Sequence, residues 1–139
     1  MAVATYLVDK SAYARGHHPL VRARLEPLIL HGRVATCSLV DLELAFSTRT
    51  ATEHSALLLE RRGFEPLVTE QADWDRALVV QSELARRGQT RAVGLPDLLL
   101  GAVAERHRVT VLHYDDDFDL LSAVTGQPVE WVVAQGAVP

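Results

Sequence analysis

Short apolar runs alternate with longer, mixed polar and apolar segments along the chain, and this alternation constrains the fold more than any other feature. Each short run has the length and burial pattern of a strand, and each longer segment has helical spacing with Ser, Pro or Gly at its ends. Strand–helix alternation is typical of a parallel sheet with helices on both faces. The sequence therefore predicts a three-layer α/β/α sandwich with a central, mostly parallel sheet, and we expect residues 1–139 to form one domain.

The expected strands are Ala4–Val8, Val34–Cys37, Glu65–Val68, Val109–His113 and, at an edge of the sheet, Pro128–Val133. The expected helices are a short one from Ser11, then Pro19–Leu30, one after Ser38, Thr52–Arg62, Gln71–Arg87, one from Pro96 through Leu98–Arg106, and a last one from Asp116 or Asp117. Ser38 is expected to cap the helix that follows it, because its hydroxyl can accept a bond from an unpaired backbone amide.

Composition excludes several classes of protein. With 48% apolar and 23% charged residues the chain is expected to be globular rather than disordered. A single cysteine, Cys37, rules out an intrachain disulfide and favours a cytoplasmic setting. No apolar run approaches the roughly 20 residues of a membrane helix. The net charge of −4 argues mildly against a general nucleic-acid binder, and basic groups such as Arg61-Arg62 are interpreted as solvated helix ends.

Acidic residues occupy four positions near strand ends or in first helical turns. Asp9 follows the first strand, Glu43 lies in the helix after the second, Asp97 follows Gly94-Leu95-Pro96, and Asp115 opens an acidic run after the fourth strand. Since ligand sites in parallel sheets lie at the carboxyl ends of the strands, we expect these side chains to converge there. Carboxylates between apolar residues are unfavourable to bring together unless a cation compensates them.

The type of side chain favours Mg²⁺ or Mn²⁺ over zinc. Hard divalent cations prefer oxygen ligands, and this set contains carboxylates without histidine or cysteine. Such metals activate water and neutralise phosphate charge in an in-line displacement. The chain has neither a G-x-S-x-G nucleophile motif nor a glycine-rich phosphate loop, which supports a metal-activated water as the attacking group.

Helical geometry leaves two choices open. Asp41 and Glu43 are two residues apart and point to nearly opposite sides of a helix, so only one of them can face the cleft. Asp115 and Asp117 share a direction only if the chain turns between them. Asp117 is therefore either a further ligand or a helix cap.

Four motifs in order resemble the PIN-domain nucleases, and their spacing is most similar to the VapC-type toxins of toxin–antitoxin pairs. The motifs are Leu7-Val8-Asp9-x-Ser11-Ala12, Ser38-x-x-x-x-Glu43, Asp97-x-x-x-x-Ala102 after a proline, and Val111-Leu112-x-x-Asp115-x-Asp117-Phe118. Each motif alone is weak, whereas four in the right order over nearly the whole chain are specific.

The resemblance implies a PIN-like fold and a Mg²⁺- or Mn²⁺-dependent endoribonuclease. Asp9, Glu43, Asp97 and Asp115 would be the catalytic, metal-binding acids, with Asp117 as an auxiliary acid. The family cleaves single-stranded or looped RNA, often tRNA or rRNA, and a cognate antitoxin inhibits it. Members commonly form homodimers, and the toxin–antitoxin assembly binds its promoter DNA through the antitoxin.

Two positions depart from the commonest pattern of that family. Lys10 stands where Thr or Ser is usual, and as the only lysine of the chain it is suited to neutralise the acids or to contact phosphate. His113 stands where Thr or Ser is frequent and is suited to orient a neighbouring ligand. Ser11 and Ser38 are supporting residues, either as cleft hydroxyls or as helix caps.

Two other functions fit parts of the pattern. A phosphotransfer or phosphatase-like α/β domain also gathers aspartates at strand ends, but no lysine lies beyond Lys10, and Asp9-Lys10-Ser11 lacks the Asp-x-Asp that haloacid-type phosphatases place after the first strand. A non-catalytic PIN-like binding domain would keep the fold and lose activity, and the intact acids argue against it.

Overall fold

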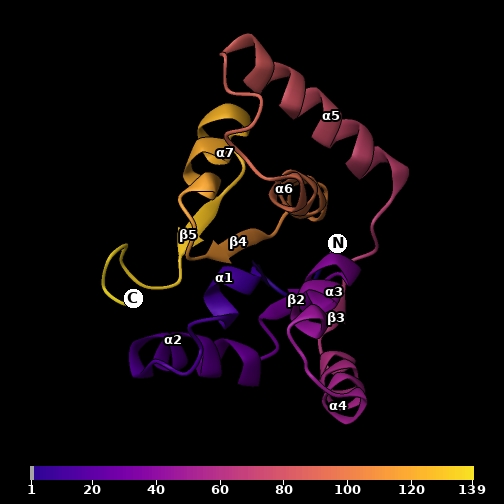
Figure 1. The fold of residues 1–139 in the computed structure, drawn as a ribbon, viewed down its shortest axis with the longest axis vertical. Coiled ribbons are helices and arrows are strands. Elements are labelled where there is room, and N and C mark those ends of the chain that lie inside the picture. The colour runs from indigo at the N-terminus through magenta and orange to yellow at the C-terminus, as the bar shows by residue number, and fades with distance from the viewer. Residues whose placement is uncertain (1) are drawn as a thin grey trace.

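A single parallel sheet forms the centre of the molecule in the computed structural model, which describes residues 2–139 (Figure 1). Within these residues the strands are β1 (Tyr6–Val8), β2 (Val34–Thr36), β3 (Glu65–Pro66), β4 (Thr110–His113) and β5 (Val129–Trp131). Their order across the sheet is β3-β2-β1-β4-β5, and every neighbouring pair is parallel. The expected parallel sheet is confirmed, with β5 at one edge as predicted and β3 at the other.

The connections between the strands are helical. The helices are α1 (Lys10–Tyr13), α2 (Pro19–Leu30), α3 (Ser38–Phe46), α4 (Ala51–Arg61), α5 (Gln71–Arg86), α6 (Leu95–His107) and α7 (Asp117–Thr125). Local signals set several ends: Pro19 occupies the first turn of α2 behind the capping side chain of His18, and Gly126 ends α7 in a left-handed conformation. His18 thus has a helix-capping role.

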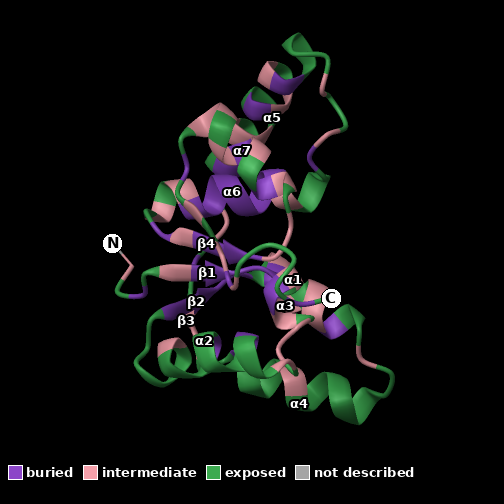
Figure 2. Ribbon diagram, turned by 90° about the vertical axis from the view of Figure 1, so that its left-hand side faces the viewer, coloured by how far each residue is buried: buried purple, intermediate pink, exposed green. Residues whose placement is uncertain are grey.

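Alternate residues of each strand face two separate apolar layers. On one face, Leu7, Ala35 and Val111 pack with residues of α3, α5, α6 and α7. On the other, Val8 and Leu112 pack with residues of α1 and α2. This period of two is expected for strands buried on both faces. Figure 2 shows the burial concentrated in the central strands and α6, while α2 and α4 are largely exposed. The three-layer sandwich is confirmed.

One predicted helix start is wrong by a residue. Cys37, not Ser38, occupies the N-cap position of α3, with an extended backbone (φ −136°, ψ 165°) and no side-chain cap. Ser38 is the first helical residue and is exposed. The extended conformation of β2 carries through Cys37, whose side chain is buried, so the chain turns into the helix one position later than the hydroxyl pattern suggested.

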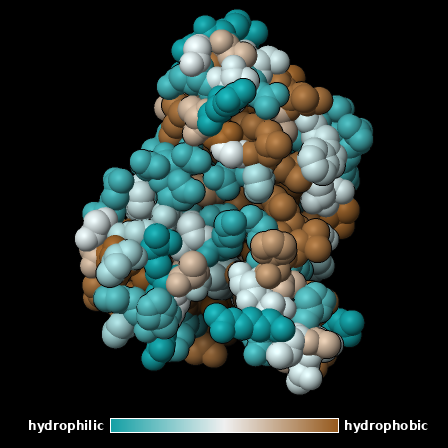
Figure 3. All heavy atoms as spheres, viewed as in Figure 1, coloured by the Kyte–Doolittle hydropathy of each residue, from teal (hydrophilic) through white to brown (hydrophobic). Residues whose placement is uncertain are grey.

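Exposed apolar side chains remain on α5 and at the start of α6. They are Trp74, Leu78, Val79 and Leu95, each more than half exposed. Figure 3 shows hydrophobic atoms over this part of the molecule. Exposed apolar side chains gathered on neighbouring helices are typical of a protein contact. No helix among residues 2–139 has the length and apolar character needed to cross a bilayer.

A close approach of α6 and α7 makes Gly101 sensitive to substitution. A Cβ added at Gly101 would lie 2.4 Å from Cδ2 of Leu121, which is itself buried in the core. Alanine normally stabilises a helix interior by about 1 kcal/mol relative to glycine. Here we expect Gly101→Ala to lower the free energy of unfolding by about 1–3 kcal/mol, because the buried Leu121 must shift to relieve the contact.

Urea unfolding of a double-mutant cycle checks this expectation. In a Leu121→Ala background the clash is absent, and Gly101→Ala should then stabilise the protein. A loss of stability of equal size in both backgrounds would show that the contact with Leu121 is not the cause.

Candidate active site at the carboxyl edge of the sheet

Asp9 lies directly after β1, at the carboxyl edge, and is only 2% exposed. Its backbone amide donates to the carbonyl of Leu112 (2.9 Å), which fixes the residue against the end of β4. Its Oδ2 accepts the backbone N–H of Ser11 (3.0 Å) and caps α1. Among the described residues, its buried Oδ1 has no hydrogen-bond partner. A buried carboxylate oxygen without a donor is a position at which a cation would be stabilised.

Three further acids meet beside it. Asp97, Asp115 and Asp117 each offer a carboxylate oxygen, and these oxygens lie within 4.8 Å of one another. Asp97 is in the first turn of α6, where Gly94 and Pro96 start the helix, and the other two acids follow β4. Residues far apart in the chain thus converge, as predicted from the parallel order of the strands.

Asp117 is the first residue of α7 and does not cap it. Asp115 Oδ1 accepts the backbone N–H of Asp117 (2.9 Å), so Asp115 supplies the local capping bond. Asp116 occupies the N-cap position of α7 without a side-chain capping bond. The carboxylate of Asp117 is therefore left to point toward Asp97 and Asp115.

The proximity of these charges perturbs Asp97 strongly. Burial raises the pKa of Asp97 to about 7, and the charges of Asp9 and Asp115 add to the effect, followed by Asp117 and Glu43. Burial also raises the pKa of Asp117, as does the charge of Asp115, while a hydrogen bond from the backbone of Gly94 opposes the rise. Without a compensating cation, one carboxyl group of the cluster retains a proton near neutral pH.

The structure separates Asp41 from Glu43, which helical geometry alone left open. Asp41 points away from the acidic cluster and accepts hydrogen bonds from Thr36 Oγ1 (2.7 Å) and Arg61 Nε (3.0 Å). Glu43 pairs with Lys10 instead, with its Oε2 3.2 Å from Nζ of Lys10, and its charge contributes to the raised pKa of Asp97. Asp41 thus holds α3 to β2 and α4, whereas Glu43 belongs to the candidate active site.

Lys10 neutralises part of the acidic cluster. Its ammonium group pairs with Glu43, which is the main cause of a raised Lys10 pKa, and the charges of Asp9 and Asp97 contribute in the same direction. Glu43 is only 13% exposed in this pair, while Lys10 keeps 56% of its side chain in solvent. The exposed ammonium group is therefore accessible to a ligand at the mouth of the site.

Two supporting residues connect the ligand-bearing segments. Ser11 Oγ accepts the backbone N–H of Tyr114 (2.8 Å), which ties α1 to the chain leaving β4. His113 Nδ1 accepts the backbone N–H of Asp115 (3.2 Å), and burial lowers the His113 pKa. A neutral imidazole that accepts at Nδ1 carries its proton on Nε2. Ser38, the third supporting residue of the prediction, is exposed at the start of α3 and does not cap it.

Sequence reasoning missed the role of Arg61, and the interpretation of Arg61-Arg62 as a solvated helix end is wrong for Arg61. Only 4% of Arg61 is exposed. Its guanidinium lies between the rings of Tyr13 (4.9 Å) and Phe64 (4.1 Å) and donates to Asp41 and Thr36. A planar guanidinium can stack and form directional bonds at once, so it tolerates burial better than lysine. No local pattern in the sequence distinguishes Arg61 from its exposed neighbour Arg62.

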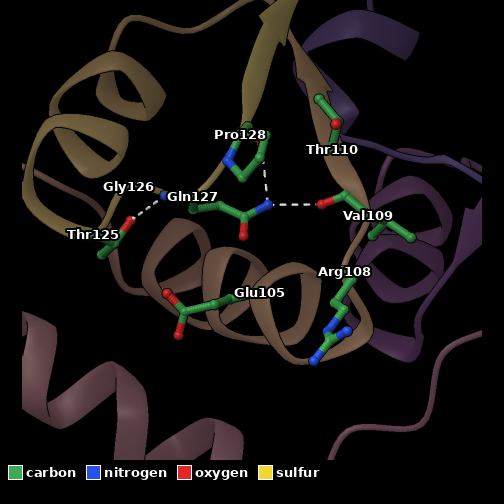
Figure 4. A pocket seen from close by; sticks show the side chains of 8 residues that line it. All are labelled: Glu105, Arg108, Val109, Thr110, Thr125, Gly126, Gln127 and Pro128. Atoms are coloured by element: carbon green, nitrogen blue, oxygen red, sulfur yellow. Dashed lines mark hydrogen bonds between the residues drawn. The ribbon is translucent and has the colours of Figure 1, made fainter. Parts of the chain in front are cut away.

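The residues at the carboxyl edge fit a divalent cation by their chemistry. The candidate ligands are oxygen donors, the unpaired Oδ1 of Asp9 is buried, and three other carboxylates are close enough to share one ion. The opposite edge of the sheet is different. A cavity of about 330 Å³ there is closed partly by Gln127, whose amide donates to the carbonyls of Val109 and Pro128 (Figure 4).

These observations define a class of protein: a parallel α/β domain with acids gathered at the carboxyl edge of its sheet. Residues 6–124 match the family model described as the PIN domain. The chain is 48% identical to ribonuclease VapC21 of Mycobacterium tuberculosis, over 94% of this chain and 96% of that protein. It is 43% identical to ribonuclease VapC51 of the same organism, over 96% of each. The chain belongs to the PIN-domain family.

A solved structure agrees with this assignment at the level of the fold. The DNA-bound VapBC of Salmonella typhimurium matches with a TM-score of 0.74 and 18% identity, over 94% of this chain and 100% of that one. The resemblance inferred from the four motifs is thus confirmed.

Neutralising Asp41 should destabilise the protein much more than neutralising Glu43 does. We expect Asp41→Ala to lower the free energy of unfolding by about 2–3 kcal/mol, because it leaves the buried Arg61 without its carboxylate partner. Glu43→Gln should change stability by less than about 1 kcal/mol, because its partner Lys10 is exposed. Urea unfolding of both variants measures the difference. An equal loss in both would contradict the separation of roles.

The contribution of Asp97 to the stability of the metal-free protein should fall as pH rises from about 4 to about 7. The ordinary Asp97 pKa is 3.8 and the native value is about 7, so between them the native state holds a proton that the unfolded chain has released. The contribution of Asp97 to the free energy of unfolding therefore decreases with pH across this window. Asp97→Asn removes the effect and should be more stable than wild type above pH 7 by about 1–2 kcal/mol, allowing for solvent screening.

Urea unfolding in EDTA across this pH range provides the measurement, and the difference between variant and wild type isolates Asp97 from the other titrating groups. A difference that does not change with pH would show that Asp97 is not perturbed in the native state.

Proposed function

We propose that the chain is a Mg²⁺- or Mn²⁺-dependent endoribonuclease toxin that cleaves structured cellular RNA, such as tRNA or rRNA, and is inhibited by a cognate antitoxin. The observation that carries the proposal is the convergence of Asp9, Asp97 and Asp115 at one edge of the sheet, with an unpaired buried oxygen on Asp9. VapC21 and VapC51, which are named ribonucleases, are similar to this chain over nearly its full length.

Asp9, Glu43, Asp97 and Asp115 would hold the metal ion, and Asp117 would be a further ligand. When bound, Mg²⁺ or Mn²⁺ lowers the pKa of water and neutralises charge on a phosphodiester. The other residues position these acids. Ser11 holds the backbone after β4 against α1, and His113 fixes the amide of Asp115.

In the absence of metal, Lys10 and Asp97 both reduce the negative charge of the acidic cluster. Lys10 compensates Glu43, and Asp97 holds a proton near neutral pH because burial and its acidic neighbours disfavour its charged form. Asp97 would release that proton when a divalent cation is bound, and Lys10 would stay at the mouth of the site, where RNA phosphates would arrive.

Protein partners are proposed by analogy with the solved relatives. VapBC of Salmonella typhimurium is described as a DNA-bound complex. We infer that this chain likewise pairs with an antitoxin, that DNA contact is made through the antitoxin, and that the toxin forms a homodimer in the cytoplasm. The exposed apolar residues of α5 and α6 supply a surface suited to such a contact.

Asp9→Asn and Asp97→Asn should each lower the rate of RNA cleavage by about a thousandfold or more, because each removes a charge needed to hold the metal. The measurement is cleavage of total cellular RNA by antitoxin-free protein in Mg²⁺, Mn²⁺ or EDTA. Asp75→Asn is a matched control, because Asp75 is exposed on α5 and hydrogen-bonds only to Gln71 on the surface. Discrete fragments that persist in EDTA or in both site variants would refute the assignment.

A further inference from the structure

A shallow groove of about 390 Å³ adjoins the acidic cluster on the side of β4 and β5. It is lined by Ser11, Arg15, Tyr114, Trp131, Gln135 and the two acids Asp115 and Asp116. Asp115 belongs both to this groove and to the acidic cluster, and Ser11 contributes the turn that follows Asp9. An extended ligand that reaches the cluster from this side would therefore lie in the groove.

Arg15 presents a fixed cation to the groove. Its Nη1 donates to the carbonyl of Ser11 (2.8 Å), its Nε donates to the backbone oxygen of Pro139 (3.0 Å), and its guanidinium stacks 4.4 Å from the centre of the Tyr114 ring. Within residues 2–139, Arg15 forms no ion pair with an acidic side chain. A guanidinium held in place with N–H groups still free is suited to bind phosphate.

Trp131 presents an oriented aromatic ring to the same groove. It is the last residue of β5 and is partly exposed. Its ring lies 4.9 Å from the ring of His113 and 5.3 Å, edge-on, from that of Tyr114, and its indole N–H donates to Asp119 (3.1 Å). These contacts fix the ring plane, so stacking on it requires little further ordering. Stacking on such a ring accepts any base.

We propose that this groove binds an unpaired RNA nucleotide next to the cleaved linkage, with a phosphate on Arg15 and the base against Trp131. The proposal rests on the proposed function, because it takes RNA as the ligand. An aromatic ring beside a guanidinium is the combination that single-stranded nucleic acid requires. The position of the groove also places the adjoining phosphate beside Asp115.

The cavity at the opposite edge of the sheet serves as an internal comparison. Its volume is about 330 Å³ and it includes Arg108, but no aromatic residue lines it and it lies at the amino end of β4 (Figure 4). We therefore expect Arg108 to interact with RNA only through non-specific charge attraction. Arg108→Gln is therefore a matched control for Arg15→Gln.

The experiment uses Trp131 as its own reporter. The chain has two tryptophans, and Trp74 is 52% exposed on α5, so Trp74→Phe leaves Trp131 as the only one at little cost to the fold. Asp97→Asn is added to prevent cleavage. Tryptophan fluorescence is then titrated with a short, unstructured RNA oligonucleotide of mixed sequence at constant Mg²⁺, and anisotropy of the same labelled oligonucleotide measures total binding.

We expect saturable quenching of Trp131. Arg15→Gln should weaken RNA binding about tenfold and lower the slope of its salt dependence by the amount expected for about one phosphate contact. Arg108→Gln should leave both the affinity and the slope unchanged. Trp131→Phe, followed by anisotropy, should weaken binding about fivefold while keeping the packing against His113. Thermal melts confirm that the variants are folded.

Binding without quenching, no binding, or equal effects of Arg15→Gln and Arg108→Gln would overturn the proposal. These outcomes are separable from those that concern the nuclease. Metal-dependent cleavage by wild type without quenching would refute the nucleotide site in the groove and support the nuclease activity. Quenching that depends on Arg15, in a protein that never cleaves RNA, would support the nucleotide site and refute the nuclease activity.

Discussion

Electrostatic repulsion between carboxylates at the carboxyl edge of the sheet is the constraint on which the rest of this structure depends. The fold brings together acids from four separate segments, although their mutual repulsion opposes it. Partial compensation comes from Lys10 on Glu43, from the backbone amides of Ser11 and Asp117, and from a retained proton on Asp97. The buried Oδ1 of Asp9 is left without a partner, and a divalent cation would satisfy it.

The same helix separates a structural acid from a functional one. Asp41 and Glu43 stand two positions apart on α3, so one faces Arg61 and the other faces Lys10. The buried Arg61 contacts Tyr13, Phe64, Thr36 and Asp41, which come from different elements around the end of β2. This network holds α3 at a fixed angle to the sheet and thereby sets the direction of Glu43. The geometry of the acidic cluster therefore depends on a cation outside it.

Much of the fold was predictable because its signals are local. Pro19 marks the start of α2, and the apolar run before Asp9 marks a buried strand that stops at the site. The convergence of the acids followed from the parallel sheet alone. The choice between Asp41 and Glu43 did not follow from helical geometry, and only the resemblance of the Ser38-x-x-x-x-Glu43 motif to the PIN-domain nucleases favoured Glu43. The burial of Arg61 and the role of Asp115 in capping α7 depend on tertiary contacts that no local pattern encodes.

Calorimetric titration of the metal-free protein with Mn²⁺ tests most directly whether these carboxylates hold a divalent cation. We expect saturable binding accompanied by proton release between pH 6 and pH 7, because Asp97, whose pKa is about 7, would lose its proton when the cation is bound. Asp97→Asn should abolish the proton release and weaken binding by about tenfold or more. An absence of Mn²⁺ binding, or binding unchanged by Asp97→Asn, would contradict the account.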